Sequence, residues 1–207
     1  MRITENEKRL ETLCKKRKFE YFDVIDSTNL YLKNNVSDSM PVVVSDCQTA
    51  GRGRLGRSFY SRGGIYFSVP YKFTSDEKYL SFLTLSAGLA VRQAIENITG
   101  LCALIKWPND IYLNGRKICG ILVETLVSDC DITAVVGIGI NTDTSDFPDD
   151  INNKAGSLNL KSFGRDNISL VSSVINILDE LVFNKKLTSE DNEETDNFVG
   201  LLNKYSY

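Results

Sequence analysis

The sequence predicts an α+β fold in which a mixed, mainly antiparallel sheet is backed by helices. Two segments, 74–100 and 168–183, carry apolar residues three and four positions apart, which is typical of helices that pack on a core. Between them lie three short segments rich in valine, isoleucine and leucine, separated by turn residues and not by helices. Since strands joined by short turns run in opposite directions, this part of the sheet is expected to be antiparallel.

The first third of the chain predicts two helices and two strands. Residues 4–18 have the composition of a charged helix, and Ser27 can cap a short helix that begins at Thr28 and runs through STNLYLKNN. The apolar run 42–45 predicts a compact strand. Beyond a loop rich in glycine and arginine, residues 58–73 are aromatic and β-branched and are broken by two glycines, so they predict a strand and a turn.

The first core helix has both of its ends marked in the sequence. Thr74 and Glu77 form a capping box, and Gly100 stops the apolar spacing that runs from Leu80 to Ile98. This apolar stripe is expected to face the core.

Three strands are expected after this helix, and a final acidic region follows the second core helix. The strands correspond to LCALIK, KICGILVETLV and DITAVVGIGIN, with reversals near Asn114-Gly115 and Asp129. After 168–183, the polar stretch TSEDNEETDN leads into a last short helix that is expected to end at Tyr207.

Composition narrows the class of protein. A chain of 207 residues that is 42% hydrophobic fits one large domain or two small ones, and we expect one domain spanning 1–207. Its formal net charge of -3 argues against a non-specific binder of nucleic acid or of acidic membranes, which carries a cationic excess. We expect no nucleic-acid partner and no membrane, because no apolar run of about 18 residues is present.

Two residue types restrict the chemistry further. The five cysteines are an odd number without a C-x-x-C pair, which favours buried thiols in a reducing, cytoplasmic environment. Histidine is absent, so Ser-His-Asp, Cys-His and histidine-ligated metal sites are excluded.

The loop GRGRLGRS, residues 51–58, fits three generic patterns incompletely. It has the G-x-G-x-x-G spacing of a dinucleotide loop, and it differs from a phosphate loop by Arg57 in place of lysine. Both of those loops present their phosphate to the N-terminus of the next helix, whereas here a strand is expected to follow. Its arginines also resemble a nucleic-acid contact, which the net charge of the chain disfavours.

A second polar group interrupts the apolar strands at Lys106-Trp107-Pro108-Asn109-Asp110, and Lys117 opens a strand otherwise suited to burial. Asn109 and Asp110 can be plain turn residues and Lys117 an edge charge. Alternatively, Lys106 and Lys117 converge with the arginines of the loop into a polyanion site. The residues alone leave both interpretations open.

Five segments together resemble the ordered motifs of the biotin protein ligases: DSTN, QTAGRGRLGR, KWPNDI, KICGILVE and GIGIN, between about residues 23 and 145. The resemblance implies the biotin/lipoate ligase catalytic-domain fold, similar to class II aminoacyl-tRNA synthetase cores. It also implies the reaction: biotin and ATP give biotinyl-5'-AMP, and biotin then passes to a lysine of a biotin carboxyl carrier domain of a carboxylase. ATP with Mg²⁺ is the expected cofactor, and the metal ligands stay unassigned.

The resemblance also implies roles for individual residues. Arg52, Arg54 and Lys117 would be catalytic, holding the biotin carboxylate and the α-phosphate. The biotin contacts would be Ser27, Thr28, Asn29, Gln48, Gly51, Arg52, Arg54, Lys117 and Gly120. The ATP contacts would be Arg54, Arg57, Phe59, Lys106, Trp107, Asn109, Asp110 and Asn141. The arginine loop is expected to be flexible without ligand and to close over the adenylate.

The sequence departs from the family pattern in ways that leave alternatives. Ser58-Phe59 stands where relatives often have a basic residue and tryptophan, so Phe59 would retain the aromatic lid with one positive charge fewer. No room is expected for an N-terminal winged helix, and the small C-terminal β-barrel of many members is expected to be absent. The alternatives are a lipoate-protein ligase-like acyltransferase and a biotin-binding protein without turnover. The protein is expected to be a monomer or a homodimer.

Overall fold

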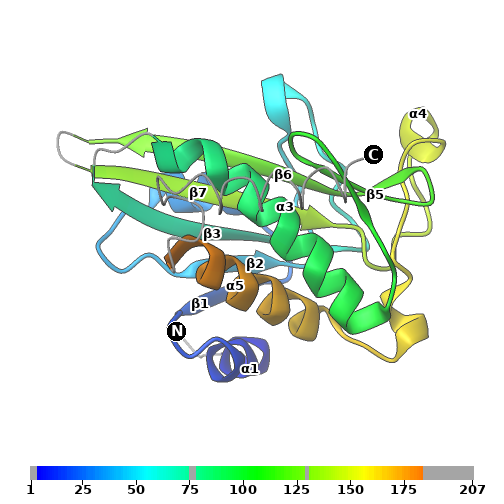
Figure 1. Cartoon of the computed structure of the whole chain (residues 1–207), viewed down its shortest axis with the longest axis horizontal. Coiled ribbons are helices and arrows are strands. Elements are labelled where there is room, and N and C mark those ends of the chain that lie inside the picture. The colour runs from blue at the N-terminus through cyan, green and yellow to red at the C-terminus, as the bar shows by residue number, and fades with distance from the viewer. Residues whose placement is uncertain (1–3, 75–77, 129–130, 184–207) are drawn as a thin grey trace, which may run out of the picture.

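A computed structural model describes residues 4–74, 78–128 and 131–183. Seven strands form one sheet in the order β1-β2-β3-β7-β6-β5-β4 (Figure 1). The strands are β1 Phe19–Phe22, β2 Val42–Ser45, β3 Ile65–Thr74, β4 Leu104–Lys106, β5 Asp110–Leu113, β6 Arg116–Val127 and β7 Asp131–Ile140. Only the β1–β2 pair is parallel among these strands. The predicted mixed, mainly antiparallel sheet is therefore confirmed.

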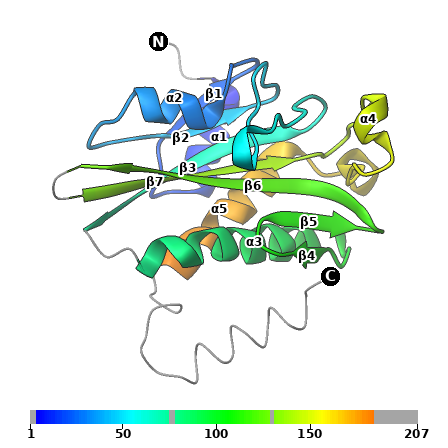
Figure 2. The same ribbon diagram turned by 90° about the horizontal axis from the view of Figure 1, so that it is seen from above.

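Helices cover the sheet unequally on its two faces. The α-helices are α1 Glu5–Leu13, α2 Thr28–Asn34, α3 Lys78–Thr99, α4 Asp149–Asn152 and α5 Asn167–Phe183, and the 3₁₀ turns are η1 Arg54–Gly56 and η2 Leu160–Phe163. The two long helices, α3 and α5, pack together on one face, and α2 lies on the other (Figure 2). Much of the α2 face is left for a site.

The alternation of side chains along β7 explains this asymmetry. Val136, Ile138 and Ile140 belong to the main core beneath α3 and α5. The residues between them, Gly137 and Gly139, face the opposite side, because successive strand residues point to opposite faces. One face of the strand thus packs in the core, and the other face lets side chains approach the backbone closely at its glycines.

Helix α1 and two strands differ from the sequence prediction. Helix α1 has the Thr4 cap but ends at Leu13 and not near residue 18. The segment after Leu13 contacts α5, where Arg17 forms a 2.6 Å ion pair with Asp179. The strands β1 and β5 were not predicted; each has four residues and is only partly buried, so neither carries a clear apolar pattern.

Several predictions lie outside the described residues: Glu77 of the capping box, the side chain of Leu80, the reversal at Asp129, and the acidic stretch with the last helix ending at Tyr207. Among the helices that are described, none is long and apolar enough to cross a membrane.

Candidate active site

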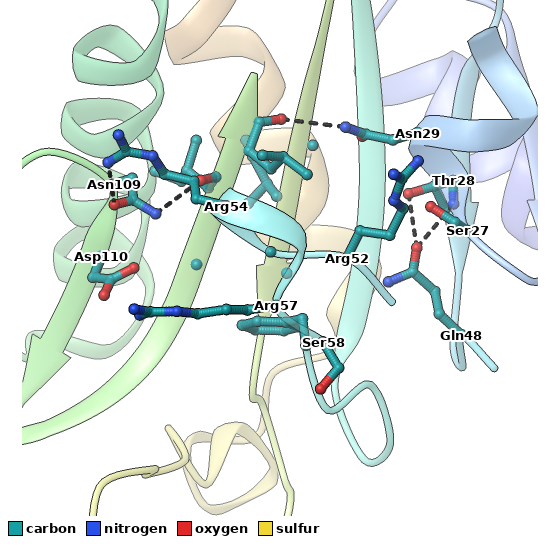
Figure 3. A pocket seen from close by; sticks show the side chains of 18 of the residues that line it. Ser27, Thr28, Asn29, Gln48, Arg52, Arg54, Arg57, Ser58, Asn109 and Asp110 are labelled. Atoms are coloured by element: carbon teal, nitrogen blue, oxygen red, sulfur yellow. Dashed lines mark hydrogen bonds between the residues drawn. The ribbon is translucent and has the colours of Figure 1, made fainter. Parts of the chain in front are cut away.

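A pocket of about 260 Å³ opens on the α2 face of the sheet, above a floor made largely of glycine (Figure 3). Gly137 of β7 lies between Ser68 of β3 and Leu122 of β6. One step along, Gly139 pairs with Gly120 of β6. Because three neighbouring floor positions lack side chains, other groups can approach the backbone of the sheet closely there.

The floor glycines are needed for packing as well as for space. A Cβ on Gly120 would lie 2.8 Å from the ring of Phe59, and one on Gly139 would lie 2.7 Å from the same ring. A Cβ on Gly137 would overlap the amide of Asn29. Phe59 and Asn29 therefore rest directly on the backbone of the floor.

One end of the pocket is lined mainly by polar side chains without charge. Ser27 caps α2 as predicted, its Oγ accepting from the Leu30 amide at 3.4 Å. Gln48 Oε1 accepts from the backbone amide of Thr28 at 2.8 Å, and Gln48 Nε2 donates to Ser61 Oγ at 3.1 Å. The structure thus brings Gln48 to Ser27 and Thr28, although it follows them by some twenty positions in the sequence.

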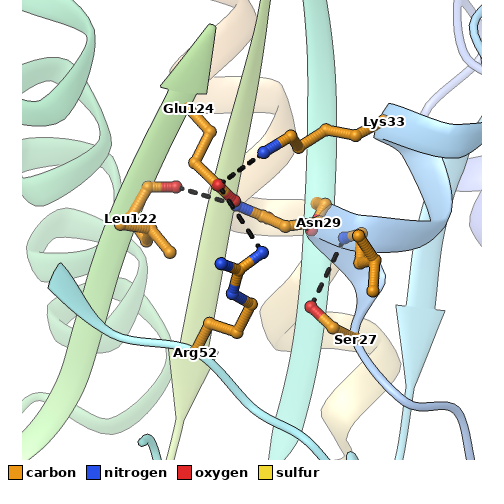
Figure 4. Close-up of polar contacts among 8 residues, drawn as sticks. Ser27, Asn29, Lys33, Arg52, Leu122 and Glu124 are labelled. Atoms are coloured by element: carbon orange, nitrogen blue, oxygen red, sulfur yellow. Dashed lines mark hydrogen bonds and ion pairs between the residues drawn. The ribbon is translucent and has the colours of Figure 1, made fainter. Parts of the chain in front are cut away.

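Asn29 lines the same end and is held at both ends of its amide (Figure 4). Its Nδ2 donates to Glu124 Oε2 at 2.9 Å and to the Leu122 carbonyl at 3.3 Å. Its Oδ1 accepts from Ser68 Oγ at 2.6 Å. The amide is therefore occupied largely by protein groups.

Glu124 is the charged member of this set. Partial burial works to raise its pKa, but hydrogen bonds from Lys33 and Asn29 and the charges of Lys33 and Arg52 outweigh it, so the pKa lies below its usual value. Lys33 Nζ is 2.7 Å from Glu124 Oε1, and Arg52 Nη1 is 4.0 Å from the same oxygen. The carboxylate stays ionised near neutral pH.

The other end of the pocket is cationic. Arg54 and Arg57 reach it from the loop after β2, and Lys117 reaches it from β6. Arg52 of the same loop lies instead beside Asn29 and Glu124 (Figure 4). Arg54 Nη1 donates to Asn109 Oδ1 at 3.2 Å, while Figure 3 shows Arg57 extending toward the side of Asp110. These cations line one cavity, as a site for an anion requires.

The cationic end also contains one ion pair. Lys117 Nζ lies 2.7 Å from Asp110 Oδ1 and 5.6 Å from the centre of the Phe59 ring. Asp110 therefore positions the ammonium group at the wall of the pocket.

The arginine loop is a turn of its own and not the start of an α-helix. The amide of Gly53 donates to the Arg57 carbonyl at 2.7 Å, and the amide of Phe59 donates to the Gly51 carbonyl at 2.9 Å. Only the 3₁₀ turn η1 lies between these contacts. The dinucleotide-loop and phosphate-loop geometries, which both need a following α-helix, are thus excluded.

Four predicted site residues do not line this pocket. Gly51 packs against Ser61 and the Phe59 carbonyl at the base of the loop, behind the residues that line the pocket. Lys106 lies 4.8 Å from the ring of Tyr112, outside the pocket. Neither residue reaches the cavity, although both are close in sequence to lining residues.

Trp107 and Asn141 are the other two. Trp107 is 71% exposed and lines a neighbouring groove with Leu55, and its expected contact with ATP stays a prediction. Asn141 is buried, and its Nδ2 donates to the Gly156 carbonyl at 3.0 Å. Its Oδ1 is buried without a hydrogen-bond partner in the described part of the chain.

The sequence interpretation missed Lys33, Ser61, Ser68 and Glu124 as members of the site. A signal was available for Glu124, since it closes the segment KICGILVE and shares the alternation of Gly120 and Leu122. Lys33 and Ser68 belong to no motif, and only the fold brings them to the site.

A metal ion in this pocket would be coordinated mainly by a bound phosphate compound and water, and only to a small extent by protein side chains. The described residues contain no group of three or more histidine, cysteine, aspartate and glutamate side chains placed to bind a metal. Asp110 lines the cationic end and offers a carboxylate oxygen. Mg²⁺ is commonly bound by one or two carboxylates together with substrate phosphates and water, so this donor set fits Mg²⁺ carried by a nucleotide.

Comparison with known proteins identifies the family. Residues 21–141 match the Biotin/lipoate A/B protein ligase family. The chain belongs to this family. The matched region contains the strands and loops that supply every lining residue of the pocket.

Individual members of the family are also similar. The Bifunctional ligase/repressor BirA of Bacillus spizizenii is 40% identical over 150 residues, covering 69% of this chain and 46% of that protein. The Biotin--[acetyl-CoA-carboxylase] ligase of Paracoccus denitrificans is 40% identical over 126 residues, covering 56% of this chain and 51% of that protein. The chain spans about half the length of the curated relatives it matches.

Solved structures agree with the fold. A biotin protein ligase from Aquifex aeolicus in complex with biotin and ATP has a TM-score of 0.73 and 32% identity, covering 91% of this chain and 78% of that chain. A Leishmania major biotin protein ligase in complex with biotinyl-5-AMP has a TM-score of 0.71 over 91% of this chain and 81% of that chain. At 23% identity, the second shows the fold alone.

Proposed function

We propose that this family member is an ATP-dependent biotin protein ligase. A carboxylate oxygen of biotin attacks the α-phosphorus of ATP, forming biotinyl-5'-AMP and releasing pyrophosphate. The ε-amine of a lysine on a biotin carboxyl carrier domain of a carboxylase then attacks the acyl carbon, and AMP leaves. The observation that carries this proposal is one pocket with a polar end at Thr28 and Gln48, beside which Arg52 lies, and a cationic end at Arg54, Arg57 and Lys117.

The cationic end suits the first step. A carboxylate and a phosphate repel each other, so the site must neutralise both and hold them in line. Lys117, fixed by Asp110, is placed to bridge the two anions, and Arg52 and Arg54 approach from the loop. No nucleophilic side chain is needed, which is consistent with a chain without histidine.

The polar end suits the ureido ring of biotin. This ring carries a carbonyl acceptor and two N–H donors, and it fits hydroxyl and amide groups better than charges. Ser27, Thr28, Asn29 and Gln48 provide such groups in a narrow, glycine-floored pocket. The expected biotin contact of Gly120 is supported by its position, because its backbone forms part of the pocket floor.

The proposed ATP contacts differ in position, since some of these residues line the pocket and others lie outside it. Arg57, Phe59, Asn109 and Asp110 line the pocket, and Asp110 would hold the Mg²⁺ that neutralises phosphate charge when the nucleotide binds. Asn141 does not line the pocket, but its buried Oδ1, which has no hydrogen-bond partner among the described residues, is an acceptor suited to the amino group of adenine. Lys106 and Trp107 lie outside the pocket and would contribute only at its edge.

The setting of the enzyme is part of the proposal. We place the reaction in the cytoplasm, with the chain acting as a single catalytic domain, monomeric or homodimeric. Closure of the arginine loop over the adenylate would keep water from the mixed anhydride.

Pyrophosphate–ATP isotope exchange tests the first step. Exchange that requires biotin, and that lipoate does not support, is the expected result. Exchange with lipoate alone would favour the lipoate-ligase alternative. Calorimetric binding of biotin without exchange would indicate a binding protein without turnover. Mass-spectrometric detection of biotin on a carrier-domain lysine would then test the transfer step.

A further inference from the structure

Glu124 lies beside the pocket and not in its lining, yet it contacts two lining residues. It accepts a hydrogen bond from Asn29 at 2.9 Å and lies 4.0 Å from Arg52. Its side chain is 19% exposed and is also paired with Lys33 at 2.7 Å. One carboxylate thus connects the polar end of the pocket with the arginine loop (Figure 4).

The contacts of Asn29 fix which way its amide points. An ionised carboxylate and a backbone carbonyl only accept hydrogen bonds, so the group facing Glu124 and Leu122 must be Nδ2. Oδ1 then faces Ser68 and can only accept from it. Glu124 supplies the shorter and charged of the two acceptors.

The orientation of the Asn29 amide also fixes the hydrogen-bond directions of Ser68 and Thr28. Ser68 has a single hydroxyl proton, and it is committed to Asn29 Oδ1. Ser68 Oγ also lies 2.7 Å from Thr28 Oγ1, and Gln48 Oε1 lies 3.1 Å from the same hydroxyl. With the Ser68 proton on Asn29, the proton of Thr28 serves the shorter contact to Ser68, and Gln48 Oε1 keeps the backbone amide of Thr28 as its donor. Thr28 then keeps a lone pair to accept a hydrogen bond from a ligand.

We infer that Glu124 is a positioning residue that sets the donor and acceptor directions of Asn29, Ser68 and Thr28, so that the pocket accepts a ligand N–H. The inference rests on the proposed function, in which that donor is a ureido N–H of biotin. Lys33 keeps the carboxylate ionised, and its place one helical turn after Asn29 lets the same cation serve a carboxylate at either residue.

An exchange of the two partners tests this inference. Glu124→Gln leaves Asn29 facing a second amide, and Asn29→Asp places two carboxylates together, so each single variant should bind biotin at least about tenfold more weakly. The double variant Asn29→Asp/Glu124→Gln keeps the net charge and restores one carboxylate, one amide and Lys33. It should recover part of the biotin affinity; recovery stays incomplete because the Leu122 carbonyl, which accepts from Asn29 at 3.3 Å, loses its donor.

Calorimetry of biotin and, separately, of a non-hydrolysable ATP analogue is run on each variant. Loss of biotin affinity with little change for the analogue, and its recovery in the double variant, is the expected result. Asp38→Asn, which breaks the exposed ion pair with Lys72, is the matched control and should change neither affinity.

Two results would overturn the inference alone: equal weakening of both ligands by Glu124→Gln, which indicates general loosening, or no recovery in the double variant. Absence of biotin binding to the unchanged protein would instead overturn the proposed function and, with it, this inference.

Discussion

Lys117 Nζ lies 2.7 Å from Asp110 Oδ1, so the cation expected at the reacting carboxylate is already oriented by the protein. The two residues come from adjacent strands, β5 and β6, where the register shifts between Ile111 and Tyr112. A preoriented cation stabilises developing charge more effectively than a flexible one, because it need not reorganise during the reaction.

Replacement of Lys117 by glutamine should therefore lower the rate of adenylate formation by about 10²-fold or more, with a smaller effect on biotin affinity. Biotin-dependent pyrophosphate–ATP exchange at saturating ligand measures the rate. Lys161→Gln, at an exposed lysine of η2, is the control and should keep the exchange rate. A Lys117→Gln rate within threefold of the unchanged protein would contradict the assigned role.

Much of the architecture was predictable because long elements carry a repeated signal. Helices α3 and α5 span several turns, and their apolar spacing is a consequence of burying one face. The short, half-buried strand β5 gives no such signal, although it supplies Asp110 to the pocket.

The site was predictable only where its residues lie in motifs. The arginine loop, Thr28, Gln48 and Lys117 were found in this way. Ser68 and Lys33 were not, because their roles depend on register between distant strands and on contacts across the sheet. Trp107 lies in a motif but is mainly exposed, which shows that motif membership does not place a side chain.

The glycine floor predicts a strong size limit. Gly139→Ala would place a methyl group 2.7 Å from the Phe59 ring, so the ring must move from the floor. We expect a loss of about 1–3 kcal/mol in the free energy of unfolding and a lower adenylation rate. Chemical denaturation and pyrophosphate exchange measure the two effects.

Gly88→Ala provides a matched control for this substitution. The nearest atoms to its added Cβ are 3.8 Å away, an ordinary contact, and the residue lies in the interior of α3. Alanine is favoured over glycine there by about 0.5–1 kcal/mol, so this variant should be as stable as the unchanged protein or more so. If the two alanine variants had equal stability, the close packing of Phe59 on the floor would be wrong.

The arginine loop should retain the intermediate. Arg54 reaches across the pocket to Asn109, and removing its side chain opens this contact and removes a charge near the acyl phosphate. Arg54→Gly should therefore release biotinyl-5'-AMP faster than the unchanged protein. Release is measured by trapping free adenylate with time after a single turnover. Arg62→Gly, an exposed arginine on the same connection, should release it at the normal rate.

Because of Glu124, the free energy of unfolding should decrease as the pH falls into the acid range. Its folded-state pKa lies below the value that the same group has in the unfolded chain, about 4.3. The ionised form is thus favoured by folding, so this stabilisation is fully present above about pH 5 and is lost as the pH falls through the folded pKa. Removing the charge with Glu124→Gln should cost about 1–2 kcal/mol of unfolding free energy at pH 7, through the weakened contacts with Lys33 and Asn29.

Urea denaturation of both proteins between pH 7 and pH 3 tests this sign. The difference in unfolding free energy should shrink toward acid pH, since the unchanged protein then also carries a neutral side chain at position 124. Asp38→Asn should show a smaller difference at pH 7, because its ion pair with Lys72 is exposed to solvent. A difference between the Glu124 proteins that stays constant down to pH 3 would mean that packing, and not the charge, accounts for the contribution of this residue.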